Sequence, residues 1–121
     1  MRSYSRADRI GTRIQTCLSE LLRKKISDPR LDMVTVTGVE LTPDLREAYI
    51  YFTVASGEKA QKDALHGFES ASGFIRSSLA KQLGLRYMPR LRFLHDASFD
   101  YGSRIDRILK SLNDDDPSHD S

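Results

Sequence analysis

A small tripeptide inside a long helical pattern is the feature of this sequence that best fits a chemical role. Ala71, Ser72 and Gly73 stand in the middle of a pattern that runs from about residue 58 to residue 83. A glycine-containing break at this point would make two helices meet at an angle and leave the first backbone N–H groups of the second helix unpaired. Such groups bind phosphate. The tripeptide therefore predicts a site that holds a phosphate backbone.

Basic side chains stand where they would extend this site. Arg76 follows the tripeptide within the helix, while Arg90 and Arg92 share one face of a predicted strand. Their contacts would be to the backbone of a nucleic acid, so shape rather than base sequence would be recognised. The predicted binding residues are Arg6, Arg9, Arg13, Ala71, Ser72, Gly73, Arg76, Lys81, Arg90 and Arg92.

The charges of the chain are segregated along its length. Residues 1–30 hold eight Lys/Arg against three Asp/Glu, and residues 74–113 hold the same numbers, so each segment carries +5. Residues 31–73 hold three Lys/Arg against seven Asp/Glu, and residues 114–121 hold four Asp and no Lys or Arg. A basic face attracts polyanions even when the net charge is only +2. The pattern favours nucleic acid as the partner, although solvated helix faces would give similar runs.

Length and composition predict one domain over residues 1–113 and a disordered acidic tail over residues 114–121. The 121 residues are 39% hydrophobic and 30% charged, a balance typical of a soluble globular domain. No stretch is apolar enough to span a membrane, and no secretory signal is visible. The single cysteine, Cys17, excludes an internal disulfide and fits a reducing compartment. We therefore expect a cytoplasmic protein.

Hydrophobic periodicity predicts the elements that carry the binding residues. Residues 5–26 have an apolar stripe at helical spacing, with the arginines on an adjoining face. Residues 33–41 and 46–54 alternate as strands and should pair as an antiparallel hairpin, with a β-bulge at Gly38. The helical pattern around the tripeptide ends at Gly84, which suits a C-terminal cap. A third strand over residues 90–95 and a short helix over residues 103–112 follow.

The order helix–strand–strand–helix–kinked helix–strand is similar to a type II KH domain, an α+β fold. KH domains usually clamp nucleotides with a Gly-x-x-Gly loop, and this sequence has Ala71-Ser72-Gly73 in its place. In that respect the sequence resembles the bacterial ribosome-binding factor A family. The resemblance covers roughly residues 5–112. The further matching segments are Arg6-Ala7-Asp8-Arg9-Ile10, Ile26-Ser27-Asp28-Pro29-Arg30, Thr42-Pro43-Asp44, Gly73-Phe74-Ile75-Arg76, Pro89-Arg90-Leu91-Arg92-Phe93 and Gly102-Ser103-Arg104-Ile105-Asp106.

The resemblance implies an assembly factor rather than an enzyme. Such a factor binds the immature small ribosomal subunit, contacts its ribosomal RNA and supports late maturation, including processing of the 5′ end of that RNA. The family is also associated with growth in the cold. We expect no cofactor, no metal, no small-molecule substrate, no membrane partner and a monomer away from the ribosome.

Four other functions are weighed on sequence grounds. An enzyme is disfavoured, because His66, His95 and His119 lack metal-ligand spacing and no nucleotide-binding glycine loop is present. A protein-docking adaptor of KH-like fold would use the face that carries Tyr49 and Tyr51. A KH-like domain for non-ribosomal RNA would keep the same basic residues. A double-stranded DNA reader would need more base-reading side chains than the helix over 74–84 offers.

Overall fold

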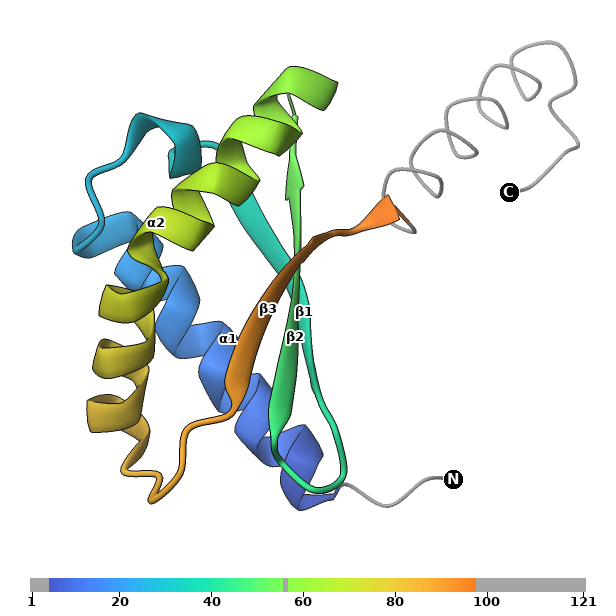
Figure 1. Cartoon of the computed structure of the whole chain (residues 1–121), viewed down its shortest axis with the longest axis vertical. Coiled ribbons are helices and arrows are strands. Elements are labelled where there is room, and N and C mark those ends of the chain that lie inside the picture. Colours follow the sequence, from blue (N-terminus) through green and yellow to red (C-terminus); the bar gives the residue numbers. More distant parts are fainter. Residues whose placement is uncertain (1–4, 56, 98–121) are drawn as a thin grey trace, which may run out of the picture.

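Two helices pack on a three-stranded sheet in the computed structural model, which describes residues 5–55 and 57–97 (Figure 1). The elements are α1 (Arg6–Lys24), the 3-10 turn η1 (Pro29–Leu31), β1 (Val34–Leu41), β2 (Glu47–Val54), α2 (Glu58–Leu83) and β3 (Arg90–His95). The predicted α+β class is confirmed. The predicted helix over 103–112, the domain boundary at residue 113 and the acidic tail lie outside the described residues. No helix in the described part of the chain is long and apolar enough to cross a membrane.

The sequence of α1 specifies both its start and its buried face. The Ser5 hydroxyl accepts a hydrogen bond from the Asp8 backbone N–H at 3.1 Å, and the Asp8 carboxylate accepts one from the Ser5 N–H at 3.0 Å. This capping box satisfies two N–H groups that the helix itself leaves unpaired. The buried side chains of α1 recur at steps of three and four, as predicted: Ile10, Ile14, Leu18 and Leu21.

The sheet has the order β1-β2-β3, with β2 in the centre. β1 and β2 pair antiparallel, and the register shifts between Val36 and Gly38, so the predicted hairpin and its bulge are both confirmed. β3 pairs parallel to β2, from Glu47 opposite Arg90 to Phe52 opposite His95. Because parallel neighbours need a crossover, α2 lies between these strands in sequence and covers the sheet.

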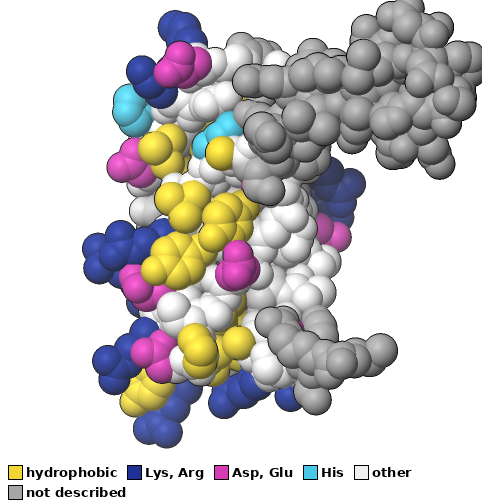
Figure 2. Space-filling model, turned by 90° about the vertical axis from the view of Figure 1, so that its right-hand side faces the viewer, with side chains coloured by type: hydrophobic (Ala, Val, Ile, Leu, Met, Phe, Trp, Pro, Cys, Tyr) yellow, Lys and Arg dark blue, Asp and Glu magenta, His cyan; other side chains and the backbone are white. Residues whose placement is uncertain are grey.

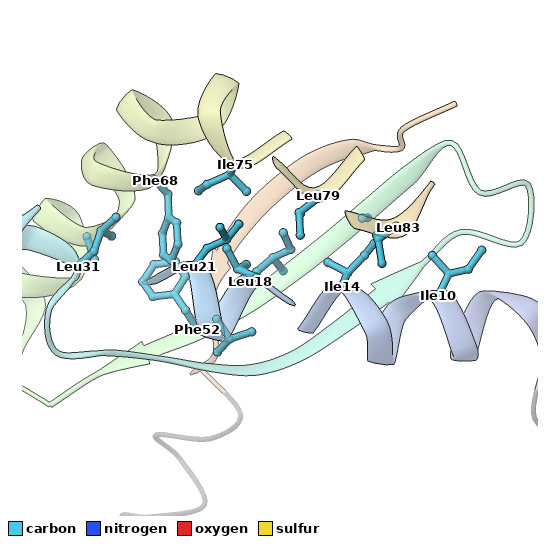
Figure 3. Packing of buried hydrophobic residues seen from close by; sticks show 14 of the residues in the cluster. Ile10, Ile14, Leu18, Leu21, Leu31, Phe52, Phe68, Ile75, Leu79 and Leu83 are labelled. Atoms are coloured by element: carbon cyan, nitrogen blue, oxygen red, sulfur yellow. The ribbon is translucent and has the colours of Figure 1, made fainter. Parts of the chain in front are cut away.

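The core lies between the helices and the inner face of the sheet (Figure 3). The centre of the Phe68 ring of α2 lies 4.5 Å from the centre of the Phe93 ring of β3, in a stacked arrangement. It lies 5.0 Å from the centre of the Phe52 ring of β2. Gly67 allows η1 to approach closely, since a Cβ at this position would lie 3.1 Å from two atoms of Leu31. These contacts join α2 to the sheet and to η1.

The prediction of two helices separated at the tripeptide is wrong, because α2 is one helix from Glu58 to Leu83. Glycine in a helix costs only about 1 kcal/mol relative to alanine, and the buried side chains of Phe68 and Ile75 anchor the helix on either side. The ribbon does change direction near its middle (Figure 1), so the segment is not straight. Gly84 ends the helix with a positive φ of 63°, as its predicted role as a cap requires.

Candidate nucleic-acid interface

A groove between α2 and β3 brings together two of the predicted binding segments. It has a volume of about 510 Å³ and is lined by Leu65, Glu69 and Ser72 from α2 and by residues 90–94 of β3. Ser72 therefore lies in the same groove as Arg90 and Arg92, although these residues are about 20 positions apart in the sequence. The groove is the place where a strand of nucleic acid would meet both the tripeptide and the basic strand.

The tripeptide does not offer the helix N-terminus that the sequence predicted. Its backbone lies inside α2, so the amides of Ser72 and Gly73 are part of a helix rather than the start of one. Gly73 is exposed, and a Cβ built on it would meet nothing within 4 Å. Ala71 packs partly against the core. The tripeptide instead presents small residues beside the groove, where a ligand can approach the helix closely.

Within the groove, Arg92 is paired with a carboxylate. The Arg92 Nε donates to Oε1 of Glu47 at 2.7 Å. This hydrogen bond holds the pKa of Glu47 below its ordinary value, and the same bond raises the pKa of Arg92. Arg90 and Arg92 alternate with partly buried Leu91 and Phe93, as predicted. Of the two arginines in the groove, Arg90 is therefore the one whose charge is less balanced by a carboxylate.

Two other predicted arginines brace the connection between α2 and β3. Arg13 Nη2 donates to the carbonyl oxygen of Leu83 at 3.5 Å, and Arg76 Nη2 donates to that of Met88 at 3.2 Å. The first bond links α1 to the C-terminal end of α2, where the helix dipole favours a cation. The remaining N–H groups of both side chains can still face a ligand, but part of their donor capacity positions the connection.

Several basic side chains lie together at one end of the molecule. Figure 2 shows Lys and Arg side chains at its lower end, where Figure 1 places the start of α1, the β1–β2 turn and the α2–β3 connection. Arg6, Arg9 and Lys81 are all exposed. Arg6 shares a hollow with Arg46 and Arg86, two residues that the sequence analysis missed. Their positions in a turn and a connection gave no periodic signal, and only the folded chain places them beside Arg6.

The described side chains do not form a metal-binding cluster that would point to a function other than binding nucleic acid. Among residues 5–55 and 57–97, no group of three or more His, Cys, Asp or Glu side chains is arranged to hold a metal ion. Cys17 packs against the core, as its place in the apolar stripe of α1 predicts.

Comparison with known proteins identifies the family. The sequence profile of ribosome-binding factor A matches residues 6–109. A ribosome-binding factor A from Desulfosudis oleivorans is 50% identical over 112 residues, which cover 93% of this chain and 87% of the relative. The crystal structure of ribosome-binding factor A from Thermus thermophilus has a TM-score of 0.66 at 27% identity, over 74% of this chain and 93% of that one.

A second Thermus thermophilus structure is a ribosome-binding factor A homology model fitted into the cryo-EM map of a 30S–RbfA complex. It has a TM-score of 0.59 at 28% identity, over 69% of this chain and 88% of that one. The profile match and the first relative each span most of the sequence. The chain therefore belongs to the ribosome-binding factor A family.

Proposed function

We propose that this protein binds the small ribosomal subunit and its ribosomal RNA as an assembly factor. The observation that carries the proposal is the α2/β3 groove, which joins Ser72 to Arg90 and Arg92. Family membership supports the choice of partner, because the Thermus thermophilus relative is described in a complex with the 30S subunit. Arginines at such a groove contact phosphates, which determine position more than sequence.

The arrangement supports a KH-like reading of the fold. In this reading α2 and β3 border the nucleotide groove, and the tripeptide replaces the usual Gly-x-x-Gly loop. The groove would bind a single strand by its backbone, with the ten predicted binding residues as the proposed contacts. Arg13 and Arg76 would act partly by holding the α2–β3 connection in place.

The finer parts of the proposal extend the family resemblance. The domain over residues 1–113 would act without catalysis or a cofactor in the cytoplasm, as a monomer away from the ribosome. It would prefer the immature subunit, support 5′-end processing of its RNA and matter most in the cold, when misfolded RNA rearranges slowly. Residues 114–121 would lie outside the binding domain.

The test is co-sedimentation of the full chain with mature and immature small subunits over a series of salt concentrations. Because phosphate contacts release counterions, binding should weaken steeply as salt rises. Preference for the immature particle, together with this salt dependence, would support the proposal. Absence of binding to both particles at low salt would refute it.

A second candidate function, a protein-docking adaptor, is favoured by the outer face of the sheet. Tyr49 and Tyr51 of β2 lie on this face, next to Leu94 of β3, which is 41% exposed. Burial and the Glu40 carboxylate raise the pKa of Tyr51, so its phenol stays neutral at physiological pH. The test is binding to a ribosomal protein. If this binding is insensitive to salt and is lost in Tyr51→Ala, the result would favour this function over RNA binding.

A further inference from the structure

A second concave site lies at the basic end of the molecule and shares no lining residue with the α2/β3 groove. It is a hollow of about 530 Å³, within the range typical of small-ligand sites. Arg6 and Ile10 of α1, Leu41 at the end of β1, residues 44–46 of the β1–β2 turn and residues 85–89 of the α2–β3 connection form its walls. Segments far apart in the sequence therefore build this hollow, which we call the basic hollow.

Three guanidinium groups surround the basic hollow. Arg6, Arg46 and Arg86 are exposed and come from three different segments. The ion pairs within residues 5–55 and 57–97 engage other basic side chains, those of Arg23, Arg30, Lys59 and Arg92. Among the described residues, no carboxylate lies within ion-pair distance of these three arginines, although Asp44 is near enough to attract Arg46. The hollow therefore carries an excess of positive charge, which suits a phosphate.

The one carboxylate in the lining is engaged within its own turn. Asp44 accepts a hydrogen bond from the Thr42 hydroxyl at 2.6 Å and another from the Arg46 backbone N–H at 3.1 Å. These bonds hold the pKa of Asp44 below its ordinary value. Asp44 thus shapes the turn that carries Arg46, and the lining keeps an excess of positive charge.

The rest of the lining suits a flat, partly apolar group. Leu41, Leu45 and Met88 are partly buried and pack against the core, so they give a fixed apolar surface. Tyr87 is 78% exposed, and the Arg86 guanidinium lies 5.5 Å from the centre of its ring. Aromatic and guanidinium planes are the surfaces on which unpaired bases stack. The basic hollow therefore combines a phosphate site with a stacking surface.

The walls of the basic hollow are held before any ligand arrives. Leu45 has a positive φ of 62°, a strained conformation for a leucine and one that concentrates at binding sites. Arg13 and Arg76 fix the two ends of the α2–β3 connection through the carbonyls of Leu83 and Met88. A site built in advance loses less conformational entropy when it binds.

We propose that the basic hollow binds a nucleoside phosphate, with the phosphate between Arg46 and Arg86 and the base against Tyr87. The nucleotide is an unpaired one in an RNA strand or a free nucleotide, since both present the same chemistry. For the RNA source, the proposal rests on the proposed function, because it gives the subunit RNA a second contact. It assigns a role to Arg46, Arg86 and Tyr87, which lie outside the groove.

The test measures binding of three probes by isothermal titration calorimetry: inorganic phosphate, adenosine 5′-monophosphate and a five-nucleotide single-stranded RNA. The wild-type chain should bind the adenosine nucleotide or the RNA at least about tenfold more tightly than phosphate, since a stacked base adds to the affinity. The Arg46→Ala/Arg86→Ala variant should lose at least about tenfold in affinity. Tyr87→Ala should remove most of the preference over phosphate.

The same probes distinguish the two sources of the ligand. Tight binding of the RNA alone identifies a strand as the ligand, and binding of the mononucleotide as tight as that of the RNA identifies a free nucleotide.

Lys25→Ala/Lys62→Ala is the matched control, because it removes two exposed positive charges outside both the hollow and the groove. Binding by Arg46→Ala/Arg86→Ala that equals binding by Lys25→Ala/Lys62→Ala would overturn the proposal. Co-sedimentation with subunits separates this failure from that of the proposed function. A chain that binds subunits but no probe lacks the nucleotide site, whereas one that binds the probes but no subunit lacks the ribosomal function.

Discussion

Arg92 of β3 and Glu47 of β2 pair diagonally across the two parallel strands, with the Arg92 Nε 2.7 Å from the Glu47 Oε1. They lie 45 positions apart in the sequence. The pair places a carboxylate beside the groove proposed to bind RNA, where it competes with phosphate for the guanidinium. Under the proposed function, Glu47 would therefore limit the affinity of the groove while it orients Arg92.

Glu47→Gln should increase RNA affinity about two- to five-fold at low salt, because exposed ion pairs are weak and Arg92 would be released for phosphate. Filter binding or fluorescence anisotropy with single-stranded RNA measures this change. In the Glu47→Gln background, Arg92→Ala should cost more affinity than it costs in the wild-type chain, as a double-mutant cycle would show. Glu58→Gln, at the start of α2, is the charge-matched control. Equal effects of the two glutamate substitutions would contradict a local role for Glu47.

Acid should destabilise the fold through three carboxylates. The pKa values of Asp28, Asp44 and Glu47 are lowered, chiefly by hydrogen bonds from Arg30, Thr42 and Arg92 respectively. A lowered folded-state pKa stabilises the protein above the ordinary values of 3.8 and 4.5, and this stability is lost as pH falls through the folded-state values. These groups should therefore leave the urea midpoint of unfolding unchanged above about pH 5.5. They should lower the midpoint when the pH is less than about 4.5. The variant Asp28→Asn/Asp44→Asn/Glu47→Gln should show a shallower acid slope, and an unchanged slope would exclude these groups as its source.

Glycine substitutions should separate helix propensity from packing. Gly73→Ala should stabilise the protein by about 0.4–1 kcal/mol, since a Cβ there meets open space and alanine favours the helix. Gly11→Ala should instead destabilise by about 1–3 kcal/mol, because its Cβ would lie 2.9 Å from the Val39 carbonyl oxygen. Urea denaturation followed by circular dichroism measures both changes. If Gly73→Ala is more stable but binds subunits more weakly, the glycine serves the interface rather than the fold.

Phe68 should be among the most costly side chains to truncate. Its ring contacts both Phe52 and Phe93 and is fully buried, so Phe68→Ala should cost about 3–5 kcal/mol of unfolding free energy. Phe74→Ala is the matched control, since this ring lies in the same helix but is 50% exposed. It should change the unfolding free energy by less than about 1 kcal/mol. Similar losses in the two variants would contradict the described packing.

Local patterns in the sequence predicted most elements, and long-range contacts accounted for what was missed. The apolar stripe of α1, the bulge before Gly38 and the alternation of β3 each depend on neighbouring residues, so periodicity revealed them. The continuity of α2 was missed because packing on both sides of Gly73 overrides the weak local preference of glycine. The Arg92–Glu47 pair and the meeting of Arg46 and Arg86 with Arg6 depend on the topology, which no local pattern encodes.

The close approach of Gly11 to the Val39 carbonyl has a mechanical consequence. With no side chain between them, α1 rests directly on the backbone of β1. Sliding or rolling α1 would drive backbone against backbone, which no side-chain rotation can relieve. At this contact α1 is therefore held at a fixed distance from β1. Under the proposed function, the arginines of α1 would keep their place relative to the sheet, and a bound RNA would adjust its own shape to them.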